Sequence, residues 1–105
     1  MERWLVSFEL RPGTEREYER RHAEIWPELT AAITAAGISN HSLFRRGTTV
    51  VGYCECEPDA ATAFAVLGAT EAHARWSRWF EGLIVESGQE GDGPFRTYDE
   101  VWHLA

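Results

Sequence analysis

The sequence predicts an α+β domain in which a four-stranded antiparallel sheet carries helices on one face. Two observations lead to this fold class. Strand-like and helix-like segments follow one another in the order βαββαβ, and five tryptophans, three tyrosines and five phenylalanines can fill a core. The 105 residues are enough for one core and well below the size at which cores divide. We therefore expect a single domain over residues 1–105.

The first predicted strand runs from Trp4 to Leu10, and the sequence RPG at Arg11 to Gly13 turns the chain after it. Thr14 and Glu17 have the spacing of a capping box. A helix should therefore begin near Glu15.

Pro27 interrupts this helical segment. It removes one amide donor and disfavours helical backbone at the preceding residue, Trp26. Either the helix kinks there, or a second helix begins with Pro27 in its first turn. In both cases Gly37 should end the helical segment.

Two strands are expected next, from Ser39 to Arg45 and from Thr48 to Glu57, joined by a turn at Arg46 and Gly47. In the second strand Cys54 and Cys56 are two residues apart and share a face. A disulfide between such positions has poor geometry, and the nearby sequence lacks further metal ligands. We expect two buried, reduced thiols and no metal.

The remaining elements complete the order. Asp59 can cap a helix that reaches about Leu67, and Thr70 can cap a second helical piece that reaches Ile84. The polar, glycine-rich stretch from Glu86 to Pro94 is predicted to be a loop, and Phe95 to Leu104 the last strand. This is the order of the ferredoxin-like arrangement.

The predicted strands have apolar residues on both faces. In the last strand Tyr98 and Trp102 point to one side, while Val101 and His103 point to the other. Helices cover only one face of a ferredoxin-like sheet. A second copy of the chain is the simplest cover for the other face, because two-fold homo-oligomers are the commonest assemblies. We therefore expect a homodimer.

Charge excludes several classes of partner. The net charge is −7, and all ten basic residues are arginines. Such a chain does not neutralise phosphates, so nucleic acid and anionic membrane surfaces are excluded, and a neutral or cationic ligand fits better. Without lysine there is no Schiff-base chemistry and no phosphate-binding loop with its lysine. No stretch approaches the roughly 20 apolar residues of a membrane span, and we expect a cytoplasmic protein.

The stretch YERRHAEIWPEL contains the most distinctive pattern. Tyr18, His22 and Trp26 are four residues apart, so they lie on one helix face. From the residues alone this is either a buried aromatic stripe or a catalytic pocket. A lone helical histidine is more often structural or solvated than catalytic.

The whole chain resembles the L-rhamnose mutarotase family of small sugar epimerases. YERRHAEIWPEL carries the resemblance, with support from GISNHSLFRR, ARWSRWF and the closing DEVWHL. The resemblance implies a ferredoxin-like monomer, a dimeric α/β barrel formed by packing two sheets, and interconversion of sugar anomers without a cofactor. The substrate it implies is a small neutral sugar, L-rhamnose above all.

The resemblance also implies roles for individual residues. His22 would be the proton donor, Tyr18 a hydrogen-bond partner of the sugar, and Trp76 an aromatic platform under its apolar face. This sequence departs from the family at His41, where a tyrosine is common, and at Ser77, where a second tryptophan is common. His41 is then a candidate for setting substrate specificity.

The chemistry of anomer exchange is compatible with these residues. Ring opening requires a proton on the ring oxygen and removal of one from the anomeric hydroxyl, and histidine titrates near neutral pH. Two other classes remain open on the sequence alone. One is a dimeric-barrel cyclase or cofactor-free monooxygenase that acts on an aromatic or polyketide compound, and the other is a binding module without catalysis.

Overall fold

The computed structural model describes residues 1–85 and 94–105. In this part of the chain four strands form one antiparallel sheet with the order β2-β3-β1-β4. The strands are β1 (Glu2–Glu9), β2 (Ile38–Arg46), β3 (Thr49–Cys56) and β4 (Arg96–Tyr98).

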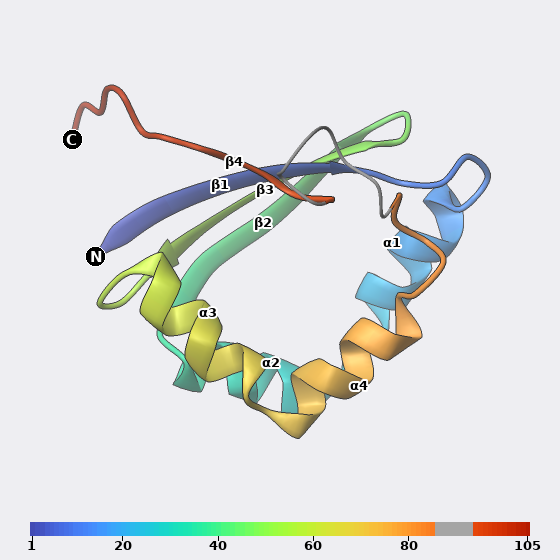
Figure 1. The fold of residues 1–105 in the computed structure, drawn as a ribbon, viewed down its shortest axis with the longest axis horizontal. Coiled ribbons are helices and arrows are strands. Elements are labelled where there is room, and N and C mark those ends of the chain that lie inside the picture. Colours follow the sequence, from blue (N-terminus) through green and yellow to red (C-terminus); the bar gives the residue numbers. More distant parts are fainter. Residues whose placement is uncertain (86–93) are drawn as a thin grey trace.

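All the helices drawn in Figure 1 lie on the same side of this sheet and leave its other side bare. They are α1 (Glu15–Ala23), α2 (Pro27–Ala35), α3 (Ala60–Gly68) and α4 (Glu71–Trp79). Each helical connection contains two short helices, as was predicted for the second connection and as one of the two alternatives at Pro27 required. The predicted α+β, ferredoxin-like fold class is confirmed.

The core lies between the helices and the inner face of the sheet, in two clusters. The buried members of the first are Ala36, Ile38, Cys54, Cys56, Ala60, Ala63 and Leu67, and those of the second are Phe8, Leu10, Tyr18, Val50, Phe80 and Leu83. The two cysteines are free and fully buried, with their sulfurs 3.7 Å apart, which confirms the expected thiols. The second cluster anchors α1 and the residues after α4 to the sheet.

Helix α1 begins at Glu15 as predicted, but the predicted capping box is wrong. Thr14 Oγ1 donates to the carbonyl of Arg11 at 2.7 Å and makes no capping bond to the helix. Glu17 does not reach back to the residue before the helix, because two arginines one turn further on bind its carboxylate. Ion pairs within the helix therefore outcompete the cap.

The other predicted helix starts are confirmed. Helix α2 begins at Pro27, after Trp26 with an extended backbone (φ −74°, ψ 139°), so the second of the two alternatives at the proline is right. Asp59 accepts a hydrogen bond from the first turn of α3, and Thr70 does the same for α4. Each of these signals is local in sequence, which explains why it could be predicted.

Two predicted boundaries within the chain are wrong. Helix α4 ends at Trp79 rather than Ile84, since Gly82 adopts a φ of +86° and Ile84 pairs with Leu10 in an isolated bridge. The hairpin turn is one residue later than predicted, at Gly47 and Thr48, because Arg46 still pairs with Thr49. Of the loop predicted over Glu86 to Pro94, residues 86–93 lie outside the described part.

The last strand is shorter than predicted. It pairs with β1 only over Arg96–Tyr98, where the hydroxyls of Ser7 and Tyr98 share a hydrogen bond of 2.7 Å. Beyond it, two hydrogen bonds of 2.7 and 2.8 Å from Arg3 to Glu100 hold the chain beside β1. Trp102 is 76% exposed. The predicted apolar residues of this segment are therefore not packed within a single copy of the chain.

A glycine after α2 generates a stability prediction. Gly37 has a φ of +96°, and a Cβ there would overlap the carbonyl oxygen of Glu57. Gly13 has a similar φ of +91° but open space around it. Gly13→Ala should therefore cost only the left-handed backbone strain of about 1–2 kcal/mol, and Gly37→Ala distinctly more. Urea denaturation of both variants tests this, and equal losses would contradict it.

Candidate active site

A cleft of about 330 Å³ opens between α1, α4 and the beginning of β4. It is lined by Tyr18, His22, His73, Trp76, Ser77, Phe80, Glu81, Gly82, Ile84, Pro94 and Phe95. Most of these side chains are aromatic or aliphatic, with a few polar groups among them, which is the usual character of a small-molecule site. The cleft lies next to the second core cluster, so its floor is firmly supported.

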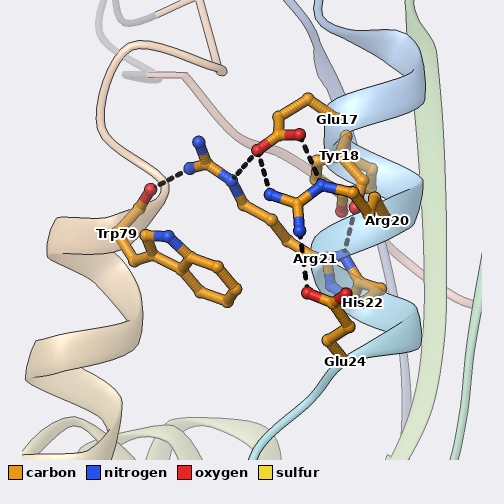
Figure 2. Close-up of polar contacts among 7 residues, drawn as sticks. All are labelled: Glu17, Tyr18, Arg20, Arg21, His22, Glu24 and Trp79. Carbon is orange, nitrogen blue, oxygen red and sulfur yellow. Dashed lines mark hydrogen bonds and ion pairs between the residues drawn. The ribbon is translucent and has the colours of Figure 1, made fainter.

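His22 is held in one orientation by its own helix. Its Nδ1 lies 3.1 Å from the backbone carbonyl oxygen of Tyr18, one turn earlier in α1 (Figure 2). A carbonyl oxygen only accepts, so Nδ1 carries the proton of the neutral ring. Nε2 is then unprotonated and able to take a proton from a ligand. This is the tautomer that a general base requires.

Aromatic rings surround the His22 imidazole. Its centroid lies 4.5 Å from that of Tyr18, 5.1 Å from Phe80 and 5.3 Å from Trp76. This apolar enclosure lowers the pKa of His22 by desolvation, and the bond to the Tyr18 carbonyl partly opposes the shift. The imidazole is therefore neutral at neutral pH.

Tyr18 is buried, with its ring edge-on to Phe8 of β1 and to Phe80. Burial raises the pKa of its hydroxyl, so the phenol keeps its proton. Since Tyr18 also lines the cleft, it can offer a hydrogen bond to a bound molecule.

Trp76 and Trp79, which have helical spacing, occupy different places. Trp76 lines the cleft, and its ring meets those of His22 and Phe80. Trp79 is not among the lining residues and stacks on Trp26, at a centroid distance of 5.3 Å and an interplanar angle of 18°. Trp26 is therefore a packing residue. Ser77 also lines the cleft.

His41 is the one predicted site residue that does not line this cleft. It follows a β-bulge in β2, where Asn40 has a φ of +48°. Beyond the bulge, side chains alternate so that Leu43 and Arg45 face the helices, and His41 belongs to the same row. Desolvation and repulsion from His22 lower the pKa of His41, so the two imidazoles influence each other.

Several residues that line the cleft were not predicted from the sequence. His73, like Trp76 and Ser77, lines the cleft from α4, and Phe80 and Glu81 line it just after the helix ends. Helical spacing from Trp76 would have found His73, three residues before it, and Phe80, four residues after it. Nothing in the sequence could have shown that this face lies against α1.

No group of three or more histidine, cysteine or acidic side chains that could hold a metal ion occurs within residues 1–85 and 94–105. In the same residues no helix is long and apolar enough to cross a membrane.

The fold and the cleft together define a ferredoxin-like α+β protein with a small-molecule site beside a histidine on a helix. Solved structures with this fold include a mutarotase and a cyclase. An L-rhamnose mutarotase from Formosa agariphila superposes with a TM-score of 0.80 at 20% identity, covering 100% of both chains. A type-II polyketide cyclase from Streptomyces glaucescens superposes with a TM-score of 0.62 at 15% identity, again covering 100% of both. At these identities the likeness concerns the fold alone.

Sequence comparison identifies the family. The model of the L-rhamnose mutarotase family matches residues 3–104. The L-rhamnose mutarotase of Acidiphilium cryptum (strain JF-5) is 54% identical over 114 residues, which cover 99% of this chain and 99% of that protein. The chain belongs to the L-rhamnose mutarotase family, as the resemblance of its sequence indicated.

Three histidines, His22, His41 and His73, generate a prediction of pH-dependent stability. Burial lowers the pKa of His22, His41 and His73, so below about pH 6.5 the unfolded chain binds more protons than the folded one. The free energy of unfolding should therefore fall as the pH is lowered from 7 toward 5. Urea denaturation across this range should show a smaller slope for His22→Gln than for wild type. Identical slopes for wild type and His22→Gln would contradict a lowered pKa for His22.

Proposed function

We propose that this protein is an isomerase that interconverts the α and β anomers of L-rhamnose or a closely related neutral sugar. Membership of the L-rhamnose mutarotase family supports the reaction. The single structural observation that carries the proposal is the 3.1 Å contact between His22 Nδ1 and the Tyr18 carbonyl, which leaves Nε2 of this cleft residue free to accept a proton.

In the proposed reaction His22 carries one proton between two oxygens of the sugar. Nε2 takes the proton of the anomeric hydroxyl, the bond between C1 and the ring oxygen breaks, and the imidazolium returns the proton to that oxygen. Both oxygens are bonded to C1, so one imidazole can serve them in turn. The open-chain aldehyde then turns about its C1–C2 bond and closes on its other face by the reverse steps. No proton, electron or cofactor is consumed.

The neighbouring residues have supporting roles in this proposal. The Tyr18 hydroxyl, which keeps its proton, donates a hydrogen bond to a sugar oxygen. Trp76 offers its ring to the apolar face of the pyranose. His41, which lies on the sheet outside the cleft lining but close enough to His22 for that ring to lower its pKa, helps to select the sugar. The described cleft lining holds one acidic residue, Glu81, and no arginine, and a net charge of −7 also disfavours an anionic ligand, so an uncharged sugar fits.

We also propose that the protein works as a cytoplasmic homodimer. The reduced thiols of Cys54 and Cys56 fit a reducing compartment. On the face of the sheet away from the helices, Phe44 is 63% exposed and Tyr98 49%. Packing two such faces together would bury them and would enclose the sheets as a barrel.

Removal of His22 should abolish most of the activity. We expect wild-type protein to accelerate exchange between the anomers of L-rhamnose, measured by NMR saturation transfer, and His22→Ala to lose roughly 10² to 10⁴-fold, the usual contribution of a positioned acid or base. Arg16→Ala, at an exposed residue of the same helix, is the control and should stay close to wild type. Wild-type exchange no faster than buffer for every sugar tested would refute the proposed function.

Replacement of His41 by tyrosine should change sugar preference. A site that hydrogen-bonds a hydroxyl discriminates against sugars that lack it, and imidazole and phenol place their polar atoms at different distances from the backbone. Exchange rates of wild type and His41→Tyr on L-rhamnose, L-fucose and a pentose should differ in their ratios. Unchanged ratios across the three sugars would mean that His41 only packs.

The dimer is tested by sedimentation velocity at micromolar concentration. A stable interface of this kind should exceed the roughly 1,200 Å² of weak contacts. Phe44→Arg, on the bare face of the sheet, should dissociate it. Val66→Arg changes an exposed residue of α3, where no interface is proposed, and should leave it intact. A monomeric wild type would rule the dimer out.

A further inference from the structure

Arg21 joins α1 to the end of α4. Its side chain is only 17% exposed. Nε donates to Glu17 of its own helix at 2.7 Å, while Nη1 donates to the backbone carbonyl of Trp79, the last residue of α4 (Figure 2). The guanidinium carbon also lies 5.0 Å from the centroid of the Trp79 ring and 5.9 Å from that of Phe80.

Arg20, the preceding residue, shows that these contacts are particular to Arg21. It binds the same Glu17 carboxylate at 2.6 and 2.7 Å, and Glu24 at 2.8 Å. All its partners belong to α1 or to the residue that follows it, and its side chain is 52% exposed. The chain thus offers two adjacent arginines with one shared partner, of which only Arg21 reaches α4.

The end of α4 matters because it forms the walls around His22. Trp76 and Phe80, in the last turn of α4 and just after it, contact the imidazole from one side. The last carbonyls of a helix have no partner within the helix, and a cation placed there both satisfies them and complements the helix dipole. Arg21 therefore fixes this turn relative to the helix that carries His22.

We propose that Arg21 is a positioning residue for the reaction: by fastening the last turn of α4 to α1, it holds the aromatic walls against the imidazole of His22. This inference rests on the proposed function, since it concerns the same site. Arg21 does not line the cleft and has no chemical step of its own.

The geometry requires arginine rather than any cation. The planar guanidinium reaches a carboxylate and a carbonyl through different nitrogens and still lies over aromatic rings. A lysine ammonium keeps the charge but cannot hold both acceptors from one fixed plane. A pair of substitutions can therefore separate charge from positioning.

The test compares Arg21→Gln, Arg21→Lys and the control Arg20→Gln. Anomer exchange on L-rhamnose is measured by saturation transfer, and the pKa of His22 by NMR titration of its ring protons. We expect both Arg21 variants to lose about 10- to 100-fold in rate, as misplacement of a catalytic group does. We also expect the His22 pKa to rise toward its ordinary value of about 6.5, because water enters the loosened enclosure. Arg20→Gln should change neither quantity appreciably.

The neighbouring charges make the titration interpretable. Besides Arg21, the ionisable groups around the imidazole are Tyr18 on α1, His41 on β2, and His73 and Glu81 on the α4 side of the cleft, and none of them is altered by these substitutions. Removal of a positive charge alone would also raise the His22 pKa in Arg21→Gln. In Arg21→Lys that charge remains, so a rise there reports loosened walls.

The possible outcomes distinguish a positioning role of Arg21 from a purely structural one. Wild-type rate and wild-type pKa in Arg21→Lys would overturn the proposal, as would equal effects in Arg20→Gln and Arg21→Gln. Circular dichroism and thermal melting identify a variant that has lost its fold, and in that case Arg21→Lys, the milder change, decides. If wild type lacks mutarotase activity, the proposed function fails, but the pKa comparison still tests whether Arg21 holds the enclosure of His22.

Discussion

The packing of α1 against the end of α4 is the interaction on which the site depends. It places one imidazole among three aromatic rings from two helices that lie far apart in the sequence. The enclosure lowers the pKa of His22, and the helix itself fixes the tautomer through the Tyr18 carbonyl. The sheet also supports this arrangement, since the ring of Phe8 on β1 packs edge-on against the ring of Tyr18.

Ion pairs reinforce this packing, both between helices and between α1 and the sheet. Two arginine side chains lower the pKa of Glu17 to about 2, so its carboxylate remains charged throughout the neutral range. Arg45 of β2 binds Glu19 of α1, and Arg75 of α4 binds Glu28 of α2. Each exposed pair contributes little by itself. Together they connect α1 to the sheet and α4 to α2.

The features that could be predicted from the sequence are those set by interactions between residues close together in the chain. Pro27 at the start of α2 and the capping residues Asp59 and Thr70 act on the turn beside them, so their effects could be foreseen. The capping box at Thr14 failed because Glu17 had stronger partners within its own helix. The four-residue spacing of Tyr18 and His22 showed that they share a face. Contacts between α1 and α4 depend on the tertiary fold, so the aromatic enclosure of His22 and the role of Arg21 could not be predicted.

The two buried thiols have a practical consequence. Desolvation raises the pKa of Cys54 to about 12, and that of Cys56 is raised as well. Neither sulfur is accessible on β3, the strand paired with both β1 and β2. Only thiolates react readily with alkylating or disulfide reagents, so the folded protein protects both cysteines until the centre of the sheet opens. Labelling of these two thiols therefore reports opening of the core. Its rate in native buffer, without denaturant, measures how often the core opens.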